Sequence, residues 1–252
     1  MRKAVWLCLL AAISIGLLAP GASLAHPEDE LCRLDPDLCA ALENFDSDAP
    51  GLQDDFARTV LMERSLGETI ILYIRLGFEH ILPKGLDHIL FVCALFFAST
   101  RLRPLIWQVS SFTLAHTITL AMAITGLVHV PGHIVEPIIA ASIAFVAVEN
   151  IVFKDMQKWR PLVVFGFGLF HGLGFAGVLT ELGLPRRDLM PALISFNVGV
   201  EIGQLTIIAA LYFALRWFYE AGWYRTWLVR GANGAIAIAA LWWTFERVFL
   251  GG

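Results

Sequence analysis

Charged residues are scarce in this chain of 252 residues: Asp, Glu, Lys and Arg make up 16%, whereas hydrophobic residues make up 58%. The mean hydropathy is correspondingly high, at +0.69. A soluble globular domain normally has about 25% charged and about 45–50% apolar residues. The composition therefore argues against a soluble domain and predicts a membrane protein.

Soft metal ligands and nucleotide-binding signatures are scarce or missing as well. The chain has four Cys and five Met, and thiolates and thioethers are the ligands that copper(I) prefers. Copper(I) is therefore disfavoured as a ligand of this protein. No P-loop occurs in the sequence. Any transport would consequently be secondary, driven by an ion gradient or by the gradient of the transported species and the membrane potential.

The N-terminus has the pattern of a secretory signal. Arg2 and Lys3 precede the apolar stretch 4–18, and the small residues Ser23 and Ala25 follow it. We predict a signal peptide over residues 1–25 that is cleaved after Ala25, the alternative being an uncleaved anchor helix. Cleavage there would leave His26 first, and its free α-amine and imidazole could together chelate a cation.

Residues 26–68 are acidic and contain more than half of the 22 acids of the chain. A segment of this length buries little core by itself. Because the signal exports it, Cys32 and Cys39 are predicted to close a small disulfide loop. The acidic residues either concentrate cations near the membrane surface or form a solvated tether.

Residues 69–252 are predicted to form an all-α polytopic membrane bundle. Apolar stretches near the roughly 20 residues that cross a bilayer alternate with short basic or Pro/Gly-containing breaks. We predict six spans, at approximately 83–99, 104–127, 134–153, 161–182, 189–218 and 231–250. The stretch 69–82 is interrupted by Arg75, Glu79 and His80, and it is either an amphipathic, half-inserted helix or a seventh span.

The basic residues predict the orientation, because Lys and Arg favour cytoplasmic loops. They gather in the first, third and fifth breaks: Arg101, Arg103, Lys154, Lys158, Arg160, Arg216, Arg225 and Arg230. The fourth break has only Arg186 and Arg187. We therefore expect a multi-pass protein of the bacterial inner membrane with both mature termini on the periplasmic side.

Several ionisable groups lie at membrane depth, where each costs about 2.5 kcal/mol or more unless it is paired, hydrated or coordinated. Asp87 and His88 stand at the outer end of the first span, and His116 and His171 stand near the middle of the second and fourth. In the fifth span, residues 197, 201 and 204 share one helix face, which must look into the bundle. Glycines beside His171 and in the fifth span predict close helix packing.

Imidazole and carboxylate donors that converge from several helices suit a borderline divalent cation such as nickel, cobalt or zinc. We predict a metal site made by Asp87, His88, His116, His171 and Glu201. Additional candidates are His80, Glu136, Asn197, Gln204, Glu149 and His26. His80 and Asp87 would align on a continuous helix, but Pro83 between them weakens that inference. Glu149, Asn150 and Glu201 are also candidate proton or exit-path groups.

Two other functional classes stay open. His88, His116, His171 and Asp87 could hold zinc in an intramembrane hydrolase, assisted by Ser110 or Ser111. Alternatively, the polar groups serve only in helix packing, in an accessory protein that does not transport. We expect no prosthetic group. The lipid bilayer and a divalent metal ion are the expected partners, and nucleic acid is not one.

The segments GFEHILPKGLDHILFV, SFTLAHTITLA, VEPIIAASIAFVAVEN, FGFGLFHGLGFAGVL and FNVGVEIGQL resemble the HupE/UreJ family of bacterial membrane proteins. The resemblance covers most of residues 77–210. It implies metal uptake or supply, most of all of nickel, by a secondary permease that is not an enzyme. It also implies a link to hydrogenase or urease maturation.

The resemblance is most specific at Asp87, His88 and His171. The better characterised branch of the family has His, five residues and then Asp-His, whereas six residues separate His80 from Asp87 here. That branch also has a second His after its Phe-His-Gly motif, where this chain has Phe175 and Ala176. The sequence therefore resembles a divergent branch of the family.

Overall fold

The computed structural model describes residues 65–153, 156–181 and 189–250, which are helical apart from connecting turns. The signal peptide, His26 and the Cys32–Cys39 loop lie outside the described residues. The elements are α5 (Leu66–Ile81), α6 (Leu86–Phe97), α7 (Leu102–Ile124), α8 (Gly132–Val152), α9 (Arg160–Glu181), α10 (Leu189–Leu215), the short helices η1 (Arg216–Phe218) and η2 (Tyr224–Val229), and α11 (Arg230–Phe249). The predicted all-α class is confirmed for these residues.

The first apolar element is a bent pair of helices. A capping box starts α5, in which Ser65 accepts from the backbone N–H of Glu68 and the Glu68 carboxylate accepts from that of Ser65. The helix ends just before Pro83, and α6 continues at an angle of 71°. The 12 residues of α6 extend about 18 Å, short of the roughly 30 Å of a bilayer core. The stretch expected as one helical span at 83–99 is therefore the second half of a bent pair, and its helix is too short to cross a bilayer by itself.

Length and composition identify three helices within the described residues that can cross a membrane alone: α7, α8 and Leu189–Phe218. The α5–α6 pair makes a fourth if it is counted as one broken span. The apolar part of α9, Arg160–Phe175, is shorter, and α11 carries Asn233, Glu246 and Arg247 among its apolar residues. Three or four of the expected spans are therefore supported on these grounds.

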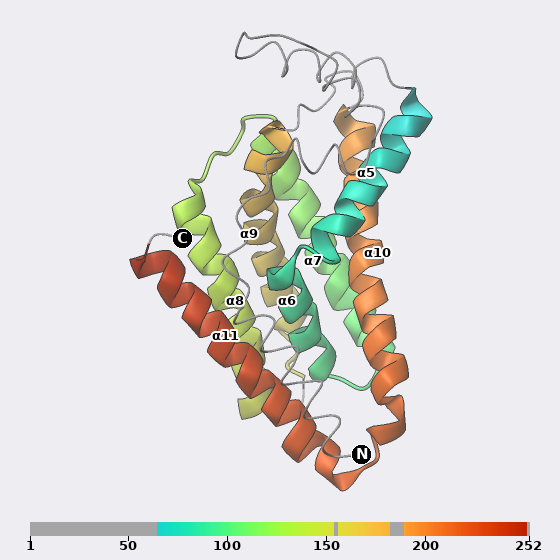
Figure 1. Cartoon of the computed structure of the whole chain (residues 1–252), viewed down its shortest axis with the longest axis vertical. Helices are drawn as coiled ribbons and strands as arrows, with labels where there is room; N and C mark the ends of the chain where they lie inside the picture. Colours follow the sequence, from blue (N-terminus) through green and yellow to red (C-terminus); the bar gives the residue numbers. More distant parts are fainter. Residues whose placement is uncertain (1–64, 154–155, 182–188, 251–252) are drawn as a thin grey trace, which may run out of the picture.

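The helices pack in pairs, α9 against α7, α10 against α5, and α11 against α8. Between these pairs lies α6, which contacts α8 and α10 (Figure 1). The C-terminal ends of α6, α8 and α10 lie toward one end of the bundle, and the starts of α5 and α10 lie toward the other (Figure 1). Polar side chains in the middle of α7 and α9 are consequently enclosed by helices.

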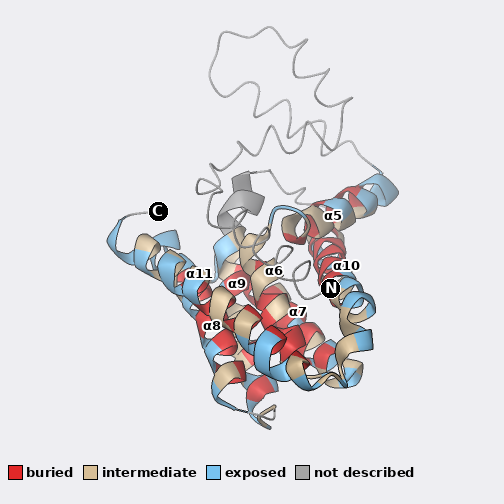
Figure 2. Cartoon of the chain, turned by 60° about the horizontal axis from the view of Figure 1, so that its bottom comes forward, coloured by how far each residue is buried: buried red, intermediate tan, exposed pale blue. Residues whose placement is uncertain are grey.

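Burial follows the arrangement expected in lipid. Buried residues gather where helices face one another, and exposed residues lie on the outward surfaces, as Figure 2 shows. The outward side chains include large apolar ones such as Trp107, Leu162 and Ile238, which are 67%, 74% and 68% exposed. Such a surface is typical of helices that contact acyl chains.

Glycines allow close contacts between helices in two of the pairs. A Cβ atom on Gly172 of α9 would overlap the carbonyl oxygen of His116 on α7. A Cβ atom on Gly199 of α10 would overlap the carbonyl oxygen of Ile74 on α5. The close packing predicted around these glycines is confirmed, and it brings the polar residues of α7, α9 and α10 within reach of one another.

We expect Gly172→Ala to lower the free energy of unfolding by about 1–3 kcal/mol, because the added methyl group must displace the backbone of α7. Gly166→Ala on the same helix is the matched control, since a Cβ atom there meets nothing within 4 Å. Thermal unfolding of the two purified variants measures the difference. Equal transition temperatures would show that the α7–α9 contact tolerates a larger spacing.

Candidate metal site

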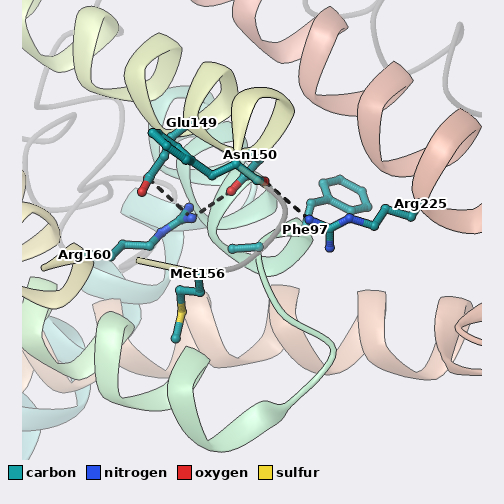
Figure 3. A pocket seen from close by; sticks show the side chains of 8 residues that line it. Phe97, Glu149, Asn150, Met156, Arg160 and Arg225 are labelled. Carbon is teal, nitrogen blue, oxygen red and sulfur yellow. Dashed lines mark hydrogen bonds and ion pairs between the residues drawn. The ribbon is translucent and has the colours of Figure 1, made fainter. Parts of the chain in front are cut away.

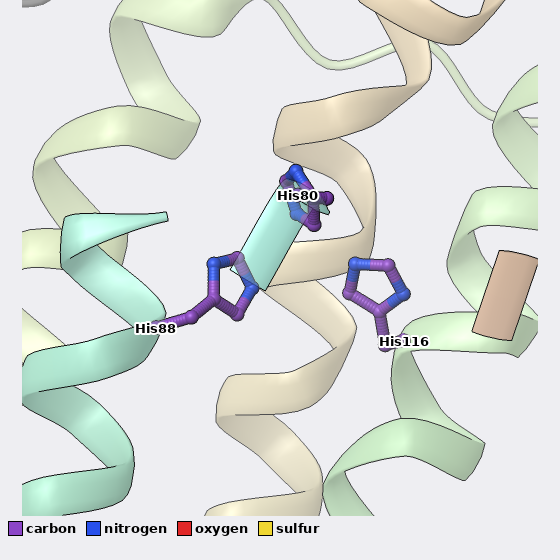
Figure 4. A group of neighbouring side chains, drawn as sticks. All are labelled: His80, His88 and His116. Carbon is purple, nitrogen blue, oxygen red and sulfur yellow. The ribbon is translucent and has the colours of Figure 1, made fainter. Parts of the chain in front are cut away.

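Three histidines from three helices form a compact group. His80 lies at the end of α5, His88 at the start of α6 and His116 in the middle of α7. One ligand nitrogen from each lies within 4.8 Å of the other two. Figure 4 shows the three rings around a common space. His88 and His116 are buried, so this donor group stands inside the bundle.

The bend at Pro83 creates this group. On a straight helix, eight residues would separate His80 and His88 by about 12 Å along the axis. The bent pair instead places their ring centroids 4.7 Å apart. The structure therefore brings His88 rather than Asp87 beside His80, unlike the alignment that a continuous helix would give.

His171 of α9 extends the group to four imidazoles. Its Nδ1 lies 3.4 Å from His88 Nε2, and the two ring centroids are 4.9 Å apart. It is only 1% exposed. The four histidines thus come from four helices that meet inside the bundle.

Hydrogen bonds fix the orientation of the His116 ring. The Asn197 amide donates to the carbonyl oxygen of Leu193 at 2.8 Å, so its own oxygen faces His116 and accepts from Nδ1–H at 3.0 Å. The Nε2 atom of His116 then carries a lone pair, and it is buried without a hydrogen-bond partner. This is the way in which an outer residue orients a metal-binding histidine.

A second residue orients His171 in the same way. Ser142 donates its single hydrogen to the carbonyl oxygen of Ile139 at 2.7 Å, so it accepts from His171 Nε2–H at 3.0 Å. The lone pair of the neutral ring is then on Nδ1, toward His88. Nε2 of His80 is likewise buried without a partner. Lone pairs of buried nitrogens therefore converge, and a cation would satisfy them.

Aromatic rings surround the imidazoles. The ring of Phe175 lies 3.9 Å from that of His80, and Phe112 lies 4.9 Å from His171 and 5.9 Å from His88. Phe175, which stands where the resemblance described in the sequence would place a histidine, packs its ring on His80. These apolar walls leave the imidazoles as the polar groups that face the centre.

The spacing of the ligand atoms defines what metal binding requires. Zinc–nitrogen bonds of about 2.0–2.1 Å in a tetrahedral site put the nitrogens about 3.3 Å apart. The present separations extend to 4.8 Å, so the rings must approach one another to coordinate an ion. Borderline divalent cations such as nickel, cobalt and zinc are the ions that imidazole nitrogens suit.

Two of the predicted carboxylate residues, Asp87 and Glu136, contact Arg247 of α11. Asp87 accepts from Arg247 Nη2 of α11 at 2.9 and 3.2 Å. The same guanidinium donates to the backbone carbonyl oxygen of Glu136 at 3.1 Å, and the Glu136 carboxylate lies over Gly132. Neither carboxylate joins the three-histidine group. No pattern in the sequence indicates the Asp87–Arg247 pair, because 160 residues separate its members.

The predicted polar face of the fifth span does look into the bundle. Asn197 contacts His116, Glu201 accepts from Ser110 and contacts the Thr113 hydroxyl, and Gln204 lies within hydrogen-bonding distance of the same hydroxyl. All three therefore face α7. Glu201 and Gln204 meet hydroxyl groups rather than the histidines.

A comparison with protein families identifies the family of the chain. The family model described as HupE / UreJ protein matches residues 57–247. The chain belongs to the HupE/UreJ family. This family is associated with nickel and cobalt handling, in relation to hydrogenase and urease. No curated protein and no solved structure shows significant similarity to the chain.

Glu149 lies away from the histidines of this HupE/UreJ family member, at the far end of α8. Its carboxylate pairs with Arg160 at 3.4 Å, and Arg160 also donates to Asn150 at 2.7 Å. Asn150 donates to Asn233 of α11 and to the carbonyl oxygen of Ala94. A small pocket beside this network is lined by Phe97, Ala98, Glu149, Asn150, Phe153, Met156, Arg160 and Arg225 (Figure 3). Sequence reasoning treated Arg160 as a loop cation and missed this pairing.

We expect Asp87 and Arg247 to stabilise the metal-free protein jointly. Their charge-assisted hydrogen bonds join α6 to α11, and both side chains are only about a quarter exposed or less, at 25% and 21%. A double-mutant cycle with Asp87→Asn and Arg247→Gln, followed by thermal unfolding, should give a coupling energy of roughly 1 kcal/mol. Additive effects of the two substitutions would show that the pair contributes nothing to stability.

Proposed function

We propose that this HupE/UreJ family member carries a divalent transition metal, nickel before cobalt or zinc, across the bacterial inner membrane by secondary transport. His80, His88 and His116 bind the ion, and His171 is the fourth ligand. The observation that carries the proposal is the convergence of buried imidazole nitrogens, two of them without any partner. Burying such groups costs free energy unless something binds them.

The proposed transporter has six membrane spans, of which the bent α5–α6 pair is the first. Basic residues support its orientation, because they cluster toward the end of the bundle where the C-terminal ends of α6, α8 and α10 lie (Figure 1). That end faces the cytoplasm by the positive-inside rule, and both mature termini face the periplasm. The histidines lie between the two ends, at the break of a helix, as substrate sites of transporters commonly do.

The ligand set favours an exchangeable ion over a permanently held one. The ligands of the site are imidazoles without a thiolate, and their nitrogens must move together before they coordinate. That rearrangement lowers the net affinity, because part of the binding free energy is spent on it. A permease needs such a site, since it must release the ion on the other side.

The hydrolase alternative draws less support from the structure. Ser110 donates to Glu201, and Ser111 lies beside the carbonyl oxygen of Pro161. Neither hydroxyl group accompanies the histidines, as a catalytic role beside a zinc-bound water would require. The accessory-protein alternative makes a different prediction, namely that loss of a histidine changes stability without changing cellular metal.

The test is accumulation of radiolabelled nickel in a host that lacks nickel uptake. Cells expressing the wild type should accumulate nickel. Cells expressing His88→Ala at a matched membrane level should accumulate at least about tenfold less. His133→Ala is the control, because His133 is exposed and stands outside the group. Unlabelled cobalt and zinc as competitors rank the cations.

A second readout reports binding without transport. Cobalt(II) added to the purified wild type and to His133→Ala should give the visible absorption of a nitrogen-coordinated ion, and His116→Ala should weaken it. If the wild type accumulates no nickel and shows no such spectrum, the permease assignment is wrong. A bound-metal spectrum without accumulation would instead favour an accessory role.

A further inference from the structure

A second polar group lies between α7 and α10, built from oxygen atoms alone. Ser110 donates to Glu201 Oε1 at 2.6 Å, and Thr113 contacts Glu201 Oε2. Thr113 also lies 3.0 Å from Gln204 Oε1 and 3.2 Å from the carbonyl oxygen of Val109. Two hydroxyls, a carboxylate, an amide and a backbone carbonyl therefore meet at this place.

This group lies one helical turn away from His116 on α7 and from Asn197 on α10. Thr113 precedes His116 by three residues on α7, and Glu201 follows Asn197 by four on α10. Asn197 is the residue that orients His116. The hydrogen bonds of the Glu201 carboxylate go to hydroxyl groups. The same two helices thus hold an imidazole level and, next to it, an oxygen level.

The oxygen level has more acceptors than hydrogens. Thr113 has a single hydroxyl hydrogen, but its oxygen lies within hydrogen-bonding distance of the Val109 carbonyl, the Glu201 carboxylate and Gln204. If the Gln204 amide is turned, its NH2 group donates to the Thr113 oxygen. The Val109 carbonyl and the Glu201 carboxylate still compete for the single hydrogen of the Thr113 hydroxyl. A positive ion at Glu201 removes the conflict. A proton on Glu201 can be donated to Thr113, whose hydrogen then goes to Val109, and a small metal cation is bound by the surplus oxygens.

We propose that Ser110, Thr113, Glu201 and Gln204 bind the coupling ion of transport, a hard monovalent cation that is either a proton or sodium. The proposal rests on the transport function proposed above. Hard cations prefer oxygen ligands, whereas the transition metal prefers the imidazoles. The oxygen atoms therefore select the hard cation and the imidazoles select the transition metal, at adjacent levels of the bundle.

The placement explains how one ion can influence the other. Occupation of Glu201 changes which acceptor the Thr113 hydroxyl serves, and thereby the contact between α7 and α10. One turn along, the same two helices carry the His116–Asn197 bond that aims Nε2 at the metal. A shift of one helix against the other consequently alters both sites, which is a coupling free energy between them.

The experiment uses the full chain in liposomes with radiolabelled nickel outside. Nickel accumulation is measured with no gradient, with an imposed pH gradient and with an imposed sodium gradient. For the wild type, one of the two gradients should raise accumulation at least about fivefold over the value without a gradient, and this identifies the coupling ion. Glu201→Gln keeps the shape of the side chain but not its charge. For this variant, the ratio of nickel accumulation with the gradient to accumulation without it should fall to about one.

Controls separate Glu201 from other titrating groups. The helices packed against α10 carry carboxyl and imidazole groups of their own: Glu68, Glu79, His80, Asp87, His88 and His116. They are present in every variant, so a comparison under one gradient cancels their contribution. Glu220→Gln is the matched control, because Glu220 is exposed beyond the end of α10, and it should respond like the wild type. Ser110→Ala and Thr113→Val should each reduce the ratio, which guards against a folding defect particular to position 201.

The cobalt(II) spectrum of each variant reports the imidazole level independently, and Glu201→Gln should keep it. If Glu201→Gln responds to the gradient as Glu220→Gln does, Glu201 does not bind the coupling ion. If the wild type takes up nickel but ignores both gradients, the inference is wrong and the permease function stands. If no nickel enters under any gradient, the permease function fails and the inference falls with it.

Discussion

The break between α5 and α6 is the constraint on which the rest of the site depends. Pro83 cannot continue α5, since it lacks a backbone N–H and its ring would clash with the preceding turn. The resulting bend of 71° brings the end of one helix and the start of the next to the same point. Gly199 of α10 holds this arrangement, because only a residue without a side chain lets α5 lie so close. A straight helix would carry His80 and His88 to different depths and leave no common site.

Once the break is in place, the remaining polar contacts follow from the need to satisfy buried groups without water. Asn197 and Ser142 each donate a hydrogen bond to a backbone carbonyl, and each therefore presents an acceptor oxygen to an imidazole. These two residues decide which nitrogen of His116 and of His171 carries the lone pair. Asn150 acts similarly, because it donates to the carbonyl oxygen of Ala94 and accepts from the buried Arg160, which also pairs with Glu149. Hydrogen bonds to backbone carbonyls thus determine which imidazole nitrogens are available to bind a cation.

The sequence predicted the helical class, the inward face of α10 and three of the four histidines in the group, because periodicity and composition report local structure. His80 ranked only as an additional candidate, since no rule states how far a proline bends a helix. Asp87 and Glu201, which the sequence predicts as ligands, lie outside the group of His80, His88 and His116. Which partner a buried carboxylate finds depends on Arg247, 160 residues away, and on the hydroxyls of α7. Contacts of that kind arise from tertiary packing, and no short-range pattern encodes them.

Separation of donor types by depth has a mechanistic consequence for this fold. Imidazole nitrogens and hydroxyl or carboxylate oxygens differ in the cations they prefer, so a mixed cluster would select neither ion well. Here α7 carries His116 at one turn and Thr113 at the next, and α10 carries Asn197, which orients His116, at one turn and Glu201 at the next, so two cations can bind close together without competing for ligands. Because both levels share the same pair of helices, a movement that closes one level must change the other. The spacing of one helical turn is therefore enough to link two binding events without a separate transmitting element.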